Sequence, residues 1–186
     1  MAQQRHSNPG RQRGVAAVEY ALYSLVFFTF MFGVIELARA MFLWNTMYTV
    51  TTRAARSAAM TNFNHSTAKL RQDAMFLAGE SDTMILAGDI GYQHLKIDYL
   101  QKDGATVVSP MPLCPAHNMV ECMSNPDSAS CIRFVRVRLC RPGTNCDHVP
   151  YSPMLPLPGL DRLNINMPWF SSVAPVETLG MPGACT

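Results

Sequence analysis

No cysteine precedes Cys114 in this chain of 186 residues, and the first thirteen residues contain no acidic side chain. Charge of either sign is absent from Tyr20 to Ile35. An uncharged, mostly apolar stretch of this kind is typical of a membrane segment and untypical of a water-exposed helix. These absences divide the sequence into an apolar N-terminal part and a cysteine-containing remainder.

The chain also lacks the short motifs that mark many enzymes: P-loop, GxGxxG, GxSxG and HExxH sequences are all missing. The net charge of +2, without a dense Lys/Arg stripe, argues against a nucleic-acid partner. The pairs Cys114/His117 and Cys146/His148 do not form the paired framework of a zinc site. We therefore expect neither catalytic residues nor a metal or other cofactor.

From Val15 the apolar run reaches about 21 residues, roughly 30 Å as a helix, which is enough to cross a bilayer core. Glu19 is its one acid. A carboxylate at mid-bilayer costs about 2.5–3.5 kcal/mol, whereas about ten strongly apolar residues contribute roughly −3 to −6 kcal/mol. Insertion of this helix into the membrane is therefore still favourable. Arg5, Arg11 and Arg13 predict a cytoplasmic N-terminus and an exported C-terminal part.

Two simple interpretations of this region compete. Ala38-Arg39-Ala40 could end a cleavable secretory signal, but the run is longer than such signals usually have. A helical seam also continues past that point, at positions 37, 41, 44, 48, 51, 55 and 58, and should pack on the exported domain. The other interpretation is a plain single-pass anchor, which leaves Glu19 unexplained. Glu36 and Arg39 are expected to pair on the surface of the emerging helix.

A third interpretation comes from residues 14–20, Gly-Val-Ala-Ala-Val-Glu-Tyr, behind a short basic leader. This sequence resembles the processing site of type IV pilins and pseudopilins, with Glu at the fifth mature position. The Glu19-Tyr20 pair, and Val15 as the first mature residue, are more similar to the tight-adherence (Tad, type IVb) branch. Residues 35–39 and 52–59 resemble the TadE-like family, and residues 165–168 and 175–180 resemble it more weakly.

The resemblance implies a bacterial inner-membrane protein, single-pass, with a cytoplasmic N-terminus and a periplasmic C-terminal domain. A prepilin peptidase would cut between Gly14 and Val15, so the chain is a substrate and not an enzyme. The helix would then pack with pilin and other pseudopilin subunits. In this way the protein would take part in the assembly or initiation of a tight-adherence pilus or a related secretion apparatus. Incorporation into the fibre itself stays open, and so does the alternative of an uncleaved anchored envelope domain that binds a partner or ligand.

The chemistry of such a cut can be stated from the residues alone. It frees the α-amino group of Val15, which is cationic at neutral pH. That amine lies about one helical turn from Glu19, and in a bundle it can meet the carboxylate of a neighbouring subunit. Opposite charges attract strongly where water is excluded, and either alone is penalised. We therefore predict that Val15 and Glu19 set the axial register between subunits.

Three segments are predicted: a leader (1–14), a membrane helix with its extension (15–60), and an exported α+β head (61–186). The head should contain a short helix from Thr67 to Ala78, ended by Gly79, and an antiparallel sheet. Strands are expected at 84–87, 95–99, 105–109, 131–140 and 163–167, with a bulge at 134–135 and a loop from 110 to 127. Arg133, Arg136 and Arg138 would protect an edge strand or, as the alternative, contact a neighbouring subunit. Six cysteines predict disulfides whose pairing the sequence leaves open: Cys114, Cys122, Cys131, Cys140, Cys146 and Cys185.

Overall fold

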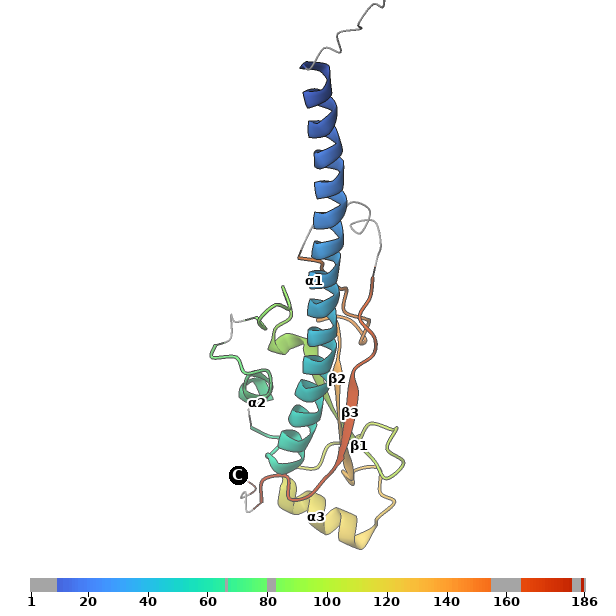
Figure 1. The fold of residues 1–186 in the computed structure, drawn as a ribbon. Helices are drawn as coiled ribbons and strands as arrows, with labels where there is room; N and C mark the ends of the chain where they lie inside the picture. Colours follow the sequence, from blue (N-terminus) through green and yellow to red (C-terminus); the bar gives the residue numbers. More distant parts are fainter. Residues whose placement is uncertain (1–9, 66, 80–82, 155–164, 182–184, 186) are drawn as a thin grey trace, which may run out of the picture. The chain divides into compact units, whose positions relative to one another are not determined.

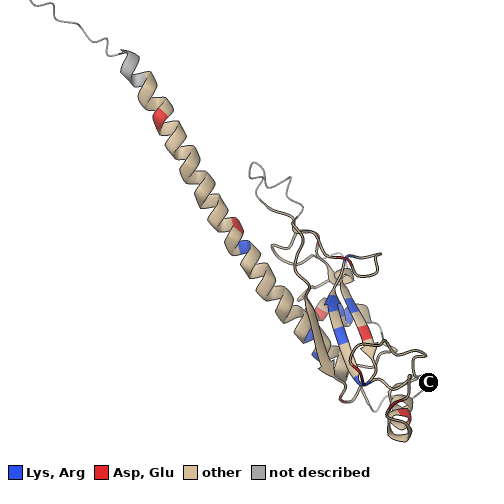
Figure 2. Ribbon diagram, turned by 90° about the vertical axis from the view of Figure 1, so that its right-hand side faces the viewer, with Lys and Arg blue, Asp and Glu red and all other residues tan. Residues whose placement is uncertain are grey.

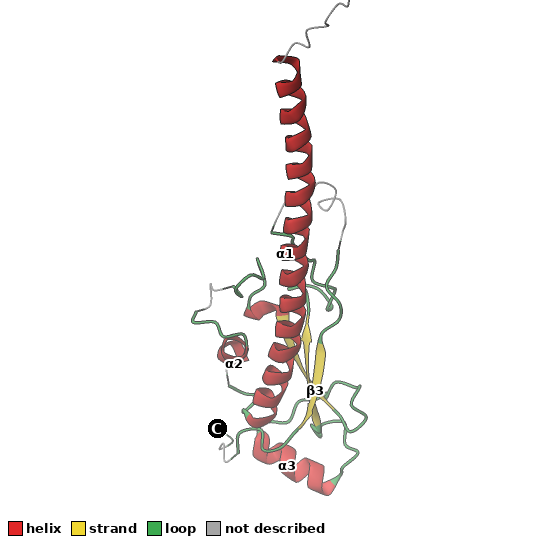
Figure 3. Ribbon diagram, viewed as in Figure 1, coloured by secondary structure: helices red, strands yellow, loops and turns green. Residues whose placement is uncertain are grey.

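A computed structural model of the chain describes residues 10–65, 67–79, 83–154, 165–181 and 185. Its elements, in chain order, are α1 (Gly10–Met60), α2 (Thr67–Ala74), the 3-10 turn η1 (Tyr92–His94), β1 (Leu95–Leu100), α3 (Pro115–Ser124), β2 (Phe134–Leu139) and β3 (Ser171–Pro175) (Figures 1 and 3). The predicted α+β class, with a long N-terminal helix, is confirmed. The first nine residues of the predicted leader lie outside the described residues.

Two compact units divide the chain: residues 1–40 with 153–163, and residues 41–152 with 164–186. In the first unit, α1 is long and apolar enough to cross a membrane, and its side chains are almost all exposed. Phe27 is 61% exposed and Phe30 is 73% exposed. Figure 2 shows this part of α1 without charge, apart from one acidic position before the Glu36–Arg39 pair. Nothing described in the chain itself covers this apolar surface.

In the second unit, α1 supplies one face of the hydrophobic core. Its buried positions are Leu43, Met47, Val50, Thr51, Ala54, Ala55, Ala58 and Ala59. The predicted seam is right from Thr51 onward and wrong before it, because Leu37, Met41, Trp44 and Tyr48 are all exposed. Before Thr51, the buried positions are each one residue earlier than a predicted position or its neighbour, at Leu43, Met47 and Val50. One residue corresponds to a rotation of about 100° around the helix.

The three strands form one antiparallel sheet in the order β1-β2-β3. Val135, Val137 and Leu139 of β2 point into the core, while Arg136 and Arg138 lie on the other face. Pairing with β1 continues without interruption from Leu139 to Phe134, so the predicted bulge is wrong. The edge-strand interpretation of the arginines is also wrong, because β2 is the central strand.

Several weaker strand predictions are also corrected. Residues 84–87 form turns, and residues 105–109 contribute a single bridge, Val107 to Leu100, in place of a strand. The predicted strand at 163–167 lies partly outside the described residues, and within it Asn166 makes one isolated bridge to Pro150. The third strand is instead Ser171–Pro175, in a stretch for which no strand was predicted. Its serines and proline have low strand propensity, so pairing with β2 stabilises it.

The helices of this unit differ from expectation at their ends. Helix α2 stops at Ala74, because Phe76 adopts a left-handed conformation (φ 58°). The Leu77 N–H donates to the Gln72 carbonyl and the Phe76 N–H to that of Asp73, which together make a Schellman motif. Gly79 therefore does not end this helix. Helix α3 lies inside the segment predicted to be a loop, with Pro115 in its first turn.

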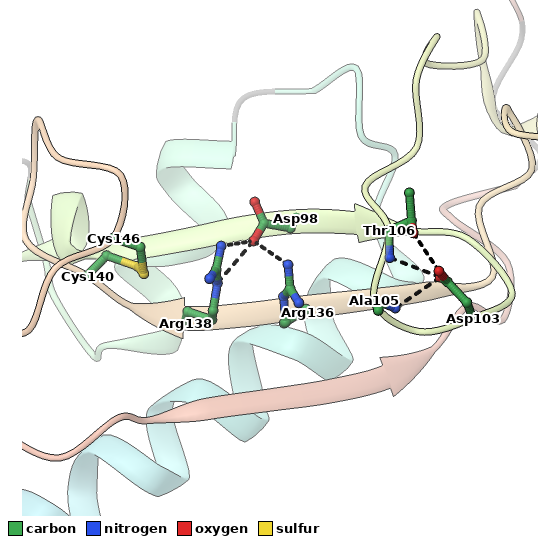
Figure 4. Close-up of polar contacts among 8 residues, drawn as sticks. All are labelled: Asp98, Asp103, Ala105, Thr106, Arg136, Arg138, Cys140 and Cys146. Atoms are coloured by element: carbon green, nitrogen blue, oxygen red, sulfur yellow. Dashed lines mark hydrogen bonds and ion pairs between the residues drawn. A yellow bond between two sulfur atoms is a disulfide. The ribbon is translucent and has the colours of Figure 1, made fainter.

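All six cysteines are paired: Cys114 with Cys185, Cys122 with Cys131, and Cys140 with Cys146. The disulfide prediction is confirmed, and the structure supplies the connectivity. The first bond joins the N-cap of α3 to the end of the chain, and the second ties the C-terminal part of α3 to the approach to β2. The last closes the loop that follows β2 (Figure 4).

Candidate functional site

The predicted processing site lies within the first turns of α1. The helix begins at Gly10, so the Gly14–Val15 bond is in helical backbone and not in an extended loop. The first four N–H groups of a helix have no partner within it, and glycine lowers helix stability by about 1 kcal/mol relative to alanine. The bond is consequently placed where the helix opens most easily.

Glu19 lies on the same side of α1 as Gly14 and Val15. Together with Val18 and Leu22 these residues line a shallow apolar hollow, and apart from the adjoining residues and helix backbone no atom lies within 4 Å of the place a Cβ on Gly14 would occupy. The Tyr23 hydroxyl donates a long hydrogen bond of 3.4 Å to Glu19 Oε1. Tyr20 is 75% exposed. The site is thus a carboxylate on an open apolar helix surface, accessible to another helix.

Comparison with known proteins bears on this same segment. A family model described as TadE-like protein matches residues 14–59, from the glycine before the predicted cut almost to the end of α1. Over this segment the chain is similar to the TadE-like family. No curated protein and no solved structure matches the chain. The resemblance inferred from residues 14–20, 35–39 and 52–59 is therefore confirmed.

The match supports a link to the Tad pilus system and to its membrane-associated components. Among the residues that the structure describes, one helix is long and apolar enough to cross a membrane, which is compatible with a single-pass anchor. The cut after Gly14, the register role of Glu19 and the division at residues 14 and 60 stay predictions.

Helix α1 carries a pair of charged residues just after its uncharged run. Arg39 Nη1 donates to Glu36 Oε1 at 2.6 Å, and the backbone N–H of Met154 donates to the same oxygen at 3.3 Å. The predicted pairing is confirmed, but its surface location is wrong: the two side chains are only 8% and 7% exposed. Charges withdrawn from water this far are tolerated because each is paired and hydrogen-bonded.

On the outer face of the sheet, Asp98 lies between two arginines that the sequence had singled out (Figure 4). Its Oδ2 accepts from Arg138 Nη2 at 2.7 Å and from Arg136 Nη2 at 3.4 Å. The register pairs Asp98 directly with Arg136 across the strands, which is the arrangement that favours opposite charges. Arg133 immediately precedes β2, and its guanidinium donates to the Cys122 carbonyl at 3.5 Å. The arginines therefore fix the alignment of two strands.

Three residues that form hydrogen bonds or ion pairs in these regions were not identified from the sequence. Tyr23 follows Glu19 by four positions, a spacing that could have indicated the contact. Asp98 alternates correctly along β1, but its partner could be identified only after the strand register was known. Asn118 is buried in α3, where its side chain accepts from the Ile132 N–H at 2.8 Å and donates to the Ile132 carbonyl at 3.4 Å. No local sequence signal marks this residue.

His94 gives the second unit a pH-dependent stability. Desolvation on burial lowers the pKa of its imidazole below 6.5, and this outweighs the bond to Gly91 and the attraction of Asp89, which raise it. The unfolded chain therefore binds a proton as the pH falls through 6.5, while the folded chain does not until the pH is lower. We expect the free energy of unfolding to be constant above pH 7 and to fall below pH 6.5.

Denaturant titrations at pH 7.5, 6.0 and 5.0 measure this effect. His94→Gln should remove much of the loss between pH 7.5 and 5.0, whereas His117→Gln, at an exposed position, should leave it unchanged. Equal pH profiles for wild type and His94→Gln would show that burial of His94 is not the cause.

Proposed function

We propose that this protein is a pseudopilin-like structural subunit of a tight-adherence pilus or secretion apparatus. Processing by a prepilin peptidase between Gly14 and Val15 removes a cytoplasmic leader and leaves an inner-membrane protein with a periplasmic head. Helix α1 then packs against the helices of pilin-type subunits and takes part in assembly or initiation. The chain acts as a substrate of the peptidase and has no catalytic role of its own.

The observation that carries this proposal is the bare apolar surface of α1 in the segment that matches the TadE-like family. From Val15 to Ile35 this surface is exposed on all sides, so lipid or other helices must cover it. Lipid alone accounts for the apolar residues but not for Glu19, whose carboxylate is favourable there only with a cationic partner. The amine created at Val15 is a cation at the matching depth.

The start of α1 suits such processing. A peptidase needs an extended peptide, and the few residues around Gly14 are the part of α1 that opens at least cost. After the cut, Val15 becomes the first residue, and the Glu19 side chain, which leans toward the N-terminus, lies close to the membrane face. Ala16, Ala17 and Ala21 leave room for a neighbouring helix on this part of α1.

In-cell photo-crosslinking tests the proposal. A benzophenone amino acid placed at Val18, which is 62% exposed beside Glu19, should form adducts with other subunits of the apparatus. The matched control is Val120 on α3, a residue of the same type that is 66% exposed. Val18 adducts with pilin-type subunits, absent from Val120, support assembly through α1. If Val18 yields no protein adduct in cells that build the apparatus, the chain is a plain anchor whose head binds a partner.

A further inference from the structure

One edge of the sheet in the second unit is open. β3 is the outer strand, and among the residues that the structure describes only β2 pairs with it (Figure 4). The Leu139 N–H donates to the Phe170 carbonyl at 3.0 Å, in the same register as the β2–β3 pairing. Backbone groups alternate between the two sides of an antiparallel strand. The groups that face away from β2 are therefore those of Ser171, Val173 and Pro175.

The first part of this edge lacks the usual protection against further pairing. Edge strands commonly carry charged side chains or proline, or are covered by another segment. The end of β1 has such a cover, because the Val108 N–H donates to the Tyr99 carbonyl at 2.9 Å. β3 contains no charged residue, and its exposed Ser171 and Val173 keep their N–H groups. Only the end of β3, at Pro175, is protected by proline.

A groove of about 450 Å³ lies beside this edge, within the second unit. Residues 172–175 line it from the strand, and four residues of α1 line it from the helix: Thr52, Arg56, Ala59 and Met60. An extended peptide that adds to a sheet edge gains affinity from main-chain hydrogen bonds and specificity from pockets for alternate side chains. β3 provides the free main-chain groups, and the groove provides the pocket.

Arg56 gives the groove a charge preference. Its side chain is exposed, and it forms no ion pair with any residue that the structure describes. Glu177 also lines the groove, but it lies two residues beyond Pro175, where pairing with an added strand ends. A peptide that lies along the first part of β3 therefore meets a cation, which favours a carboxylate at that position.

We propose that β3 and this groove bind an extended segment of another polypeptide as an added strand, with an acidic side chain next to Arg56. A second copy of this chain fits the edge less well. If two β3 strands paired around Val173, each Pro175 would lie opposite Ser171 of the other copy, and proline has no N–H to donate. The site belongs to the second unit, so the inference does not depend on the cut after Gly14.

Peptide selection on the full-length protein tests this inference. The protein is held in lipid nanodiscs, so that lipid surrounds the apolar part of α1. A phage-displayed library of dodecapeptides is selected on it, and fluorescence anisotropy gives the dissociation constant of the best synthetic peptide. Val173→Pro removes one outward N–H but none of the bonds to β2, since proline is tolerated on the free side of an edge strand. Val173→Thr keeps the N–H and is the matched control.

We expect the selected peptides to share an acidic residue. Val173→Pro should weaken binding about five- to tenfold, the effect of one lost hydrogen bond, and Val173→Thr should leave it unchanged. Arg56→Gln should weaken binding of the same peptides several-fold. Amide hydrogen exchange of the wild type needs no variant. Bound peptide should slow exchange at Ser171 and Val173, whereas Ser172 and Ala174, which already bond to β2, should change little.

Equal affinity of wild type and Val173→Pro for the peptide would overturn the inference. So would slower exchange confined to residues outside β3, or a library that yields no binding peptide. Slow exchange at Val173 without peptide, increasing with protein density, would show that a second copy covers the edge and would also overturn it.

Discussion

Replacement of Glu19 by alanine is expected to leave the protein in the membrane and to abolish its co-purification with pilin-type subunits. Insertion becomes easier, because a carboxylate costs up to about 2.5–3.5 kcal/mol within the bilayer. Assembly becomes harder, because the Val15 amine of a neighbouring subunit loses its counter-charge. An unpaired charge in a dry interface costs about 3–5 kcal/mol, which corresponds to a loss of association of roughly a hundredfold or more.

Affinity purification from detergent-solubilised membranes measures this effect. Tyr23→Phe is a close control, because it removes the 3.4 Å hydrogen bond to Glu19 and keeps the charge. Glu177→Ala is a second control, since it removes an exposed acid from the other unit. Both controls should retain their partners. Retention of partners by Glu19→Ala, at the level of these controls, would refute the register role of the carboxylate.

The disulfide between Cys114 and Cys185 should contribute the most stability of the three. It joins residues 71 apart, whereas Cys140 and Cys146 are six apart. In the chain-entropy account, closing the longer loop stabilises the fold by about 4 kcal/mol and closing the shorter one by about 2 kcal/mol. We therefore expect the double change Cys114→Ser/Cys185→Ser to destabilise the second unit about twice as much as Cys140→Ser/Cys146→Ser.

Urea denaturation of the second unit's tertiary signal, compared among wild type and the two double variants, gives these differences. The Cys140/Cys146 variant controls for the loss of a disulfide that includes a buried cysteine, because Cys114 and Cys140 are both nearly inaccessible, at 1% and 4% exposed. If the two variants lose equal stability, loop length is not what makes the first bond important.

The part of the fold that the sequence predicted well depends on charge and on strong local patterns. Helix α1 follows from an uncharged run that is preceded by one acid, and β1 from the alternation of Leu95, Ile97 and Tyr99 with polar residues. The Gly14–Glu19 spacing pointed to the segment that the TadE-like family model matches. In each case neighbouring residues alone contain the information.

The parts that were missed depend on contacts between distant residues. β3 forms because Ala174 and Ser172 pair with β2, although their own strand propensity is low. α3 is stabilised by two disulfides and by the bonds of Asn118 to Ile132, more than ten positions away. The seam of α1 was misplaced because Trp44 and Tyr48 are apolar but exposed, and a pattern of apolar residues does not distinguish side chains that face the core from side chains on the surface. Local signals did exist for α3, since Pro115 is favoured at the start of a helix.

The account as a whole depends on a positive N-terminus close to Glu19, and the intact mass of the protein tests it most directly. The protein would be extracted from membranes of cells that contain the prepilin peptidase, without added tags at its N-terminus, and measured by mass spectrometry. The account predicts a polypeptide that begins at Val15. A chain that still begins at Met1 or Ala2 would contradict it, and a start at Met41 would identify a secretory signal instead.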